Sequence, residues 1–138
     1  GDTSERTFFA GDGEPKATDS TLALTGGGTA YPIASYMLGL PVPTAAPVCV
    51  VTGAADAGST AESRVYTYAW VNSWGEPSAP YSAAPMPAST QVSVYPGQSV
   101  DVTLPVPPTG NHNITHKRIY RSVAGTSTTT YLLVAEVA

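Results

Sequence analysis

The sequence predicts an all-β fold, and three observations support that prediction. Glycine and proline each occur 13 times in 138 residues, and Thr, Ser, Val, Ala and Tyr fill much of the remainder. Apolar and polar residues alternate over several short runs, which is the period of a β-strand. No stretch shows convincing helical periodicity, and turn residues recur at the intervals typical of a two-layer sandwich. The length suits one such domain.

We place this sandwich in residues 43–138 and expect about seven strands in it. The expected strands cover residues 48–52, 64–73, 78–83, 90–95, 99–104, 115–122 and 130–137. The second of them carries Tyr66, Tyr68 and Trp70 on one face and smaller, mostly apolar residues on the other. Because it is apolar on both sides, we expect this strand at the centre of a sheet.

Residues 1–42 differ from the rest and are expected to form an extended arm and linker. This arm carries five acidic residues and a run of three glycines at 26–28. Within it, residues 6–10 and 16–18 are expected to form one β-hairpin, which should pack on a neighbour because a lone hairpin is marginal in water. Prolines at the end of the arm predict a stiff, extended linker.

The charge of the chain excludes one class of partner. The net charge is −4, so the cationic field that dominates nucleic-acid binding is missing. Half of the six basic residues are Lys117, Arg118 and Arg121, which flank Ile119 and Tyr120. We interpret this cluster as the solvated face of a strand that buries Ile119 and Tyr120. The sequence contains no run of about 18 apolar residues, so it predicts no membrane-spanning helix.

Two stretches resemble the fibronectin type III pattern. Residues 66–80 contain a tyrosine-led alternating strand that runs into Asn-x-x-Gly-x-x-Ser, which is similar to the last hairpin of that family. Residues 99–107, 117–122 and 131–137 resemble its second, third and fourth strands. The family's last hairpin here precedes these strands instead of following them. The resemblance implies an immunoglobulin/fibronectin type III-like β-sandwich.

Most of the chain also resembles a group of tailed-bacteriophage virion proteins. The matching stretches are residues 1–9, 11–16, 36–43, 74–76 and 117–121. In that group such a module lies inside a longer structural polypeptide, so the resemblance implies that the chain continues past Ala138 into another strand. It implies a place in the virion and a role in assembly, and it carries over no catalytic residue.

The candidate contact surface consists of aromatic residues. Trp74 precedes Gly75 at an expected hairpin tip, where an exposed ring can stack on a sugar or anchor a protein contact. The alternative is that this tryptophan folds back and caps the sandwich. The full set of candidate contact residues is Phe8, Phe9, Trp74, Tyr81 and Tyr95.

The sequence predicts no catalytic, cofactor or metal site. His112 and His116 are four residues apart but lie in an expected loop without nearby ligands to complete a zinc set. The acidic residues of the arm, such as Asp12, Glu14 and Asp19, lack the spacing of a calcium loop. Cys49, the single cysteine, is expected as a small buried hydrophobe and forms no disulfide within the chain.

Two functions of different classes remain open at this point. The first is a non-enzymatic structural component of a phage virion, a tail or tail-adaptor module that contacts other virion subunits or copies of itself. The alternative is a carbohydrate-binding or adhesive module of a secreted bacterial protein that binds surface glycans. A hydrolase accessory domain is a third reading, for which the sequence offers only the fold. None of them requires a cofactor or a membrane.

Overall fold

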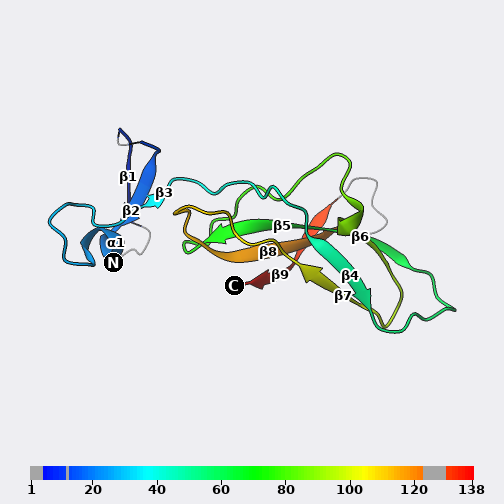
Figure 1. Ribbon diagram of the computed structural model, residues 1–138. Coiled ribbons are helices and arrows are strands. Elements are labelled where there is room, and N and C mark those ends of the chain that lie inside the picture. The colour runs from blue at the N-terminus through cyan, green and yellow to red at the C-terminus, as the bar shows by residue number, and fades with distance from the viewer. Residues whose placement is uncertain (1–4, 12, 123–129) are drawn as a thin grey trace.

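The computed structural model describes residues 5–11, 13–122 and 130–138, and it contains antiparallel sheets with little helix (Figure 1). The all-β prediction is therefore confirmed, and the arrangement is consistent with a β-sandwich. The elements, in chain order, are β1 Arg6–Phe9, β2 Lys16–Asp19, α1 Ser20–Leu24, β3 Tyr36–Met37, β4 Val48–Thr52, β5 Glu62–Asn72, η1 Ala88–Thr90, β6 Gln91–Val94, β7 Ser99–Thr103, β8 Ile114–Ser122 and β9 Tyr131–Val137.

The larger layer of the sandwich is a four-stranded sheet in the order β6-β5-β8-β9. Its centre is β5, in which every residue from Tyr66 to Asn72 is buried. This position agrees with the prediction, which was based on the apolar residues on both faces of the strand. A strand with two buried faces is expected at the centre of a sheet. Ile119 of β8 lies opposite Tyr68 and is 8 % exposed, whereas Tyr120 is half-buried.

The second layer contains β4 and β7, which pair in antiparallel register. Cys49 and Val51 of β4 lie opposite Val102 and Val100 of β7, and these four residues are half-buried. The residues that alternate with them are exposed, as expected for strands with one solvated face. β4 also lies beside β6 and η1, which brings the two layers together.

The expected strand at residues 78–83 does not form, so the described part of the sandwich has six strands. The segment still runs back along β5: the N–H of Ser78 donates to the carbonyl of Trp70 and the N–H of Tyr81 to that of Tyr68, each at 2.8 Å. Pro77 and Pro80 have no N–H, so they cannot extend these bonds into a regular ladder. The segment therefore hydrogen-bonds to β5 without forming a regular strand.

The arm is more folded than expected. Its predicted hairpin forms from β1 and β2, and β3 adds a third strand to give the order β1-β2-β3. The short helix α1 follows β2 directly because the Asp19 side chain accepts hydrogen bonds from the N–H groups of Thr21 and Leu22, both at 2.9 Å. Ala17 and Thr18 are buried inside this small unit.

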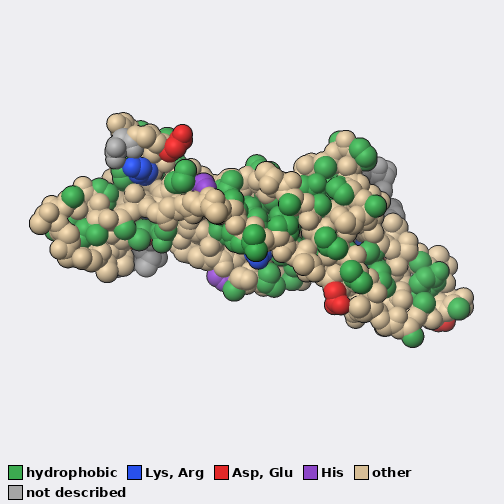
Figure 2. Space-filling view, viewed as in Figure 1, with side chains coloured by type: hydrophobic (Ala, Val, Ile, Leu, Met, Phe, Trp, Pro, Cys, Tyr) green, Lys and Arg blue, Asp and Glu red, His purple; other side chains and the backbone are tan. Residues whose placement is uncertain are grey.

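The arm lies at one end of the molecule, beside the turn in which β5 ends, and the linker runs back along the sandwich to β4 (Figure 1). On the face shown in Figure 2, hydrophobic side chains gather over the middle of the molecule and few charged ones are visible there. No helix in the described residues is long and apolar enough to cross a membrane.

Candidate functional site

Of the candidate contact residues, the structure brings Phe8 and Trp74 together, in the lining of a cavity of about 200 Å³, and leaves the other three apart. Phe8 is exposed on β1, and Phe9 lies near the ammonium group of Lys16. Tyr95 is half-buried just after β6, and its N–H donates to Oε1 of Gln98. Trp74 and Tyr81 take part in two separate sites.

The turn after β5 is organised by Asn72, which is 7 % exposed. Its Oδ1 atom accepts hydrogen bonds from the N–H groups of Trp74, at 3.0 Å, and Glu76, at 2.9 Å. Its Nδ2 group donates to Oε2 of Glu76 at 2.9 Å. Gly75 has a φ of 79°, which a side chain rarely tolerates. The turn is thus a fixed support that presents Trp74 and Glu76 to the arm.

Arg6 of β1 binds both of these side chains. Its Nη1 atom lies 2.7 Å from Oε1 of Glu76, and its guanidinium carbon is 4.8 Å from the centroid of the Trp74 ring. Tyr36 of β3 meets the same indole edge-on at 5.8 Å. Trp74 is half-buried between them, so it folds back against the arm. We call Arg6, Tyr36, Trp74 and Glu76 the docking cluster.

The charge of Glu76 is stabilised by its neighbours. Hydrogen bonds from Asn72 and then from Arg6 lower the pKa of this carboxyl below its usual value of 4.5. A carboxylate that accepts several hydrogen bonds favours its charged form. At neutral pH, Glu76 is therefore the anion that Arg6 needs.

Two hydrogen bonds, one of them from the Asn111 side chain, complete the attachment of the arm. The N–H of Met37 donates to the carbonyl of Asn111 at 2.8 Å, and Nδ2 of Asn111 donates to the carbonyl of Ser35. An exposed ion pair contributes about 0–1 kcal/mol, a cation–π contact about 0.5–1 and an aromatic pair about 0.5–1.5. With two hydrogen bonds at about 1 kcal/mol each, docking is worth on the order of 3–5 kcal/mol. These contacts are thus worth less than the roughly 5–15 kcal/mol that hold a typical domain folded.

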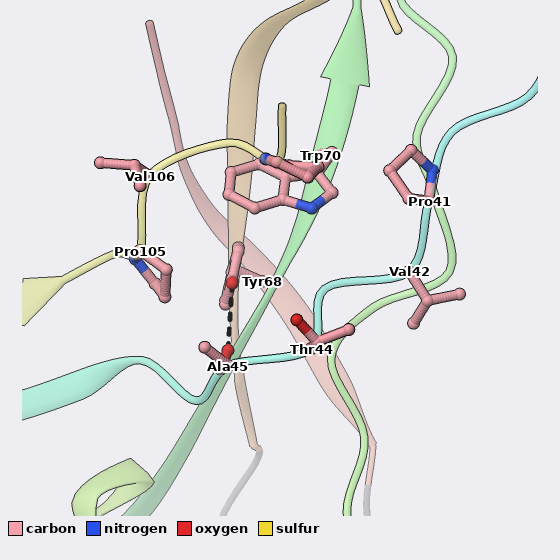
Figure 3. Close-up of a pocket in the computed structure, with 9 residues that line it drawn as sticks. Pro41, Val42, Thr44, Ala45, Tyr68, Trp70, Pro105 and Val106 are labelled. Atoms are coloured by element: carbon pink, nitrogen blue, oxygen red, sulfur yellow. Dashed lines mark hydrogen bonds between the residues drawn. The ribbon is translucent and has the colours of Figure 1, made fainter. Parts of the chain in front are cut away.

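A small cavity of about 140 Å³ lies under the linker. Tyr68 and Trp70 of β5 form its floor, and the linker and the segment after β7 form its sides (Figure 3). The hydroxyl of Tyr68 donates to the carbonyl of Ala45 at 3.0 Å, and burial, followed by the influence of Tyr81, raises the pKa of Tyr68 to about 12. The cavity lining is Pro41, Val42, Thr44, Ala45, Tyr68, Trp70, Pro105, Val106 and Pro108. These residues offer packing but no acid–base pair.

A larger open groove of about 620 Å³ lies on the other face of β5. Tyr81, Tyr120 and Tyr131 line it together with Met86 and two prolines, and none of its lining residues is charged. The hydroxyl of Thr67 donates to the carbonyl of Tyr81 at 2.6 Å and holds one wall in place. Of these three tyrosines, only Tyr81 was among the contact residues expected from the sequence, because the three come from distant segments of the chain.

β9 forms one edge of the four-stranded sheet. In the described part of the chain it pairs with β8 on one side and with no strand on the other. Leu132, Leu133, Val134 and Val137 remain 40–54 % exposed. Both faces of this edge therefore present apolar side chains, and we call these four residues the β9 edge.

The side chains that could bind a metal ion lie apart from one another in the described residues. Among the described residues, no three His, Cys, Asp or Glu side chains are grouped so that they could hold a metal ion. His116 contacts Thr115, whereas Nδ1 of His112 is buried without a partner. Cys49 is half-buried, and burial raises the pKa of its thiol. Asp12 lies outside the described residues.

Comparison with known proteins gives no match, whether with family models, with curated proteins or with solved structures.

Proposed function

We propose that this chain is a non-enzymatic structural module of a tailed-phage virion protein, and that its role is to join neighbouring subunits. The observation that carries this proposal is the β9 edge. A long sheet edge with exposed apolar residues is a template for pairing with another strand. Soluble proteins usually blunt such edges with charge or proline. β9 contains no proline, and its one charged residue, Glu136, is paired with Arg118 of the neighbouring strand.

The strand pairing supports an immunoglobulin/fibronectin type III-like module. In such a sandwich the second and fifth strands share one sheet, and the third, sixth and seventh strands share the other. If β7 and β8 are the second and third strands and β5 is the sixth, then β4 is the fifth. The observed pairs β4–β7 and β5–β8 then match this scheme, with residues 78–81 as the return of the last hairpin.

The ionisable side chains also support a structural role. Three arginines are paired with carboxylates at short distances: Arg6 with Glu76, Arg64 with Glu62, and Arg118 with Glu136. The small cavity and the tyrosine groove are lined by neutral residues. This distribution provides contact surfaces and places no acid–base pair in either of them.

The test is the association of the chain with itself. The wild type should associate as its concentration rises, and Leu133→Lys should make it monomeric because a charge on the edge opposes strand pairing. Val50→Lys is the matched control, since Val50 is 53 % exposed, as Leu133 is 54 % exposed, but lies on β4 in the other sheet. Sedimentation velocity would measure all three chains. A wild type that stays monomeric at high micromolar concentration would contradict the proposal.

A second candidate function, glycan binding, is favoured by the tyrosine groove. Aromatic rings offer stacking faces to sugars, and the uncharged lining suits a neutral saccharide. Trp74 is held by Arg6 and Tyr36 and so is less available than the groove. Binding on a glycan array that is lost in Tyr131→Ala and retained in Tyr95→Ala would favour this function over assembly.

A further inference from the structure

We propose that the arm exchanges between copies of this chain, so that the arm of one copy binds the sandwich of a second copy at Trp74, Glu76 and Asn111. The inference rests on the proposed function, because it requires copies that meet. The surface consists of Trp74, Glu76 and Asn111 of one sandwich. The segment that binds it is residues 5–40 of another copy.

The contacts between arm and sandwich are of a kind that a second copy can reproduce. The arm contributes Arg6, Tyr36 and the N–H of Met37, and the sandwich contributes Trp74, Glu76 and the carbonyl of Asn111. Each of these contacts joins the two parts directly and does not involve the linker. An arm from a neighbour therefore meets an identical surface, which is the condition for domain swapping.

The link between the two parts has a hinge at Gly39. Gly39 is exposed, has a φ of 81°, and has no atom within 4 Å of the place where a Cβ would lie. Pro41 follows shortly after, and it restricts Leu40 to extended conformations. Pro43 is buried against the sandwich and fixes the far end of the linker. A change of φ at Gly39 alone would thus swing the arm away from its own sandwich.

The size of the docking surface favours exchange. The contacts are a partly exposed ion pair, one cation–π contact, one ring pair and two hydrogen bonds, so the arm is released far more easily than the sandwich unfolds. In an assembly, neighbouring copies are present at a high effective concentration, which offsets the advantage of the chain's own arm.

A pair of charge reversals tests the exchange. In Arg6→Glu and in Glu76→Arg, each chain alone brings like charges together at the docking cluster. When the two variants are mixed, a heterodimer with exchanged arms contains one native pair and one reversed pair, so both docking sites are satisfied. Native mass spectrometry of the mixture should show this heterodimer at about ten times the abundance of either homodimer.

The matched control reverses an ion pair that lies inside one sandwich and away from β9. Arg64 and Glu62 of β5 are 2.8 Å apart. A mixture of Arg64→Glu and Glu62→Arg should show the heterodimer only at about twice the abundance of either homodimer, as in roughly random mixing, because arm exchange does not reunite these charges. An equal preference in the control mixture would overturn the inference.

A second variant tests the hinge without touching the docking cluster. Gly39→Val disfavours the positive φ, because a β-branched residue rarely adopts it, and it should raise the fraction of dimer several-fold. If neither the mixed variants nor Gly39→Val forms exchanged dimers, the inference is wrong. Association that persists in those chains and disappears with Leu133→Lys would leave the proposed function standing.

Discussion

Glu76 makes the attachment of the arm dependent on pH. Hydrogen bonds from Asn72 and Arg6 lower its pKa below 4.5, and a carboxyl with a lowered pKa contributes stability that is present above 4.5 and is lost as pH falls through its folded pKa. The bond from Asn72 lies within the turn and persists when the arm leaves. Only the part of the pKa shift that Arg6 causes is therefore linked to docking of the arm.

We expect the docking of the arm to weaken modestly as the pH falls below 4.5, because the ion pair contributes only about 0–1 kcal/mol of it. The indole N–H signal of Trp74 in NMR spectra should shift over this range, because protonation of Glu76 loosens Arg6 over the ring. In Glu76→Gln the Trp74 signal should already resemble the low-pH form and should not titrate. A constant Trp70 signal would show that the sandwich remains folded, and a Trp74 signal unchanged down to pH 3 would refute the link.

Tyr68 fixes the linker over the core. Its hydroxyl donates to Ala45 at 3.0 Å, so Tyr68→Phe should lower the free energy of unfolding by about 1 kcal/mol at pH 7. Its folded pKa of about 12 exceeds the usual 10, so stability that is present below pH 10 is lost as pH rises toward 12, and this loss should shrink in the variant. Urea unfolding measures both effects. Tyr131→Phe is the control, because the Tyr131 hydroxyl makes no hydrogen bond within the described residues.

Between elements, the pair of β5 and β8 carries the stability of the sandwich. Ile119 is 8 % exposed and lies opposite Tyr68, so Ile119→Ala should cost about 2–4 kcal/mol through lost burial and the cavity left behind. Val106→Ala, at a residue 84 % exposed, should change stability by less than about 0.5 kcal/mol. Chemical denaturation would compare them. Equal effects would mean that the core lies elsewhere.

The strands that could be predicted from the sequence are those with a strong local pattern. Residues 99–104 alternate clearly, and residues 48–52 and the centre of 64–73 are rich in apolar, β-branched and aromatic residues. All three form strands, and residues 48–52 do so with the predicted bounds. Residues 78–83 also look like a strand, but Pro77 before them and Pro80 within them prevent a continuous ladder. The five residues of α1 are too few to show a helical period, and only the capping position of Asp19 marks it.

The docking cluster could not be predicted, because its members come from distant parts of the chain. Arg6 and Glu76 are 70 residues apart, and no local pattern indicates that they pair. The sequence pointed to Trp74 as a residue of interest at a hairpin tip, with folding back as the alternative. Whether Trp74 forms a contact surface or folds back depends on where the arm lies. The position of the arm is a property of the whole molecule.

At the scale of the whole molecule, charge and the β9 edge act against each other. The net charge is −4 at neutral pH and the isoelectric point is near 4.9. Two copies that approach at pH 7 repel one another, while their exposed leucines and valines favour contact. Within the strand β9, Glu136 is paired with Arg118 at 2.6 Å, so the repulsion comes mainly from the rest of the surface.

We therefore expect self-association to strengthen several-fold as the pH is lowered from 7 to 5, where the net charge approaches zero and Glu76 still holds the arm. Raising the salt at pH 7 to about 1 M, which shortens the screening length to about 3 Å, should reproduce most of this gain. Sedimentation velocity on the wild type gives the dimer constant under each condition, and Leu133→Lys should remain monomeric throughout. Association that weakens toward pH 5, or that salt disrupts, would mean that copies meet through charged surfaces, and the β9 edge would then have to be abandoned as the contact.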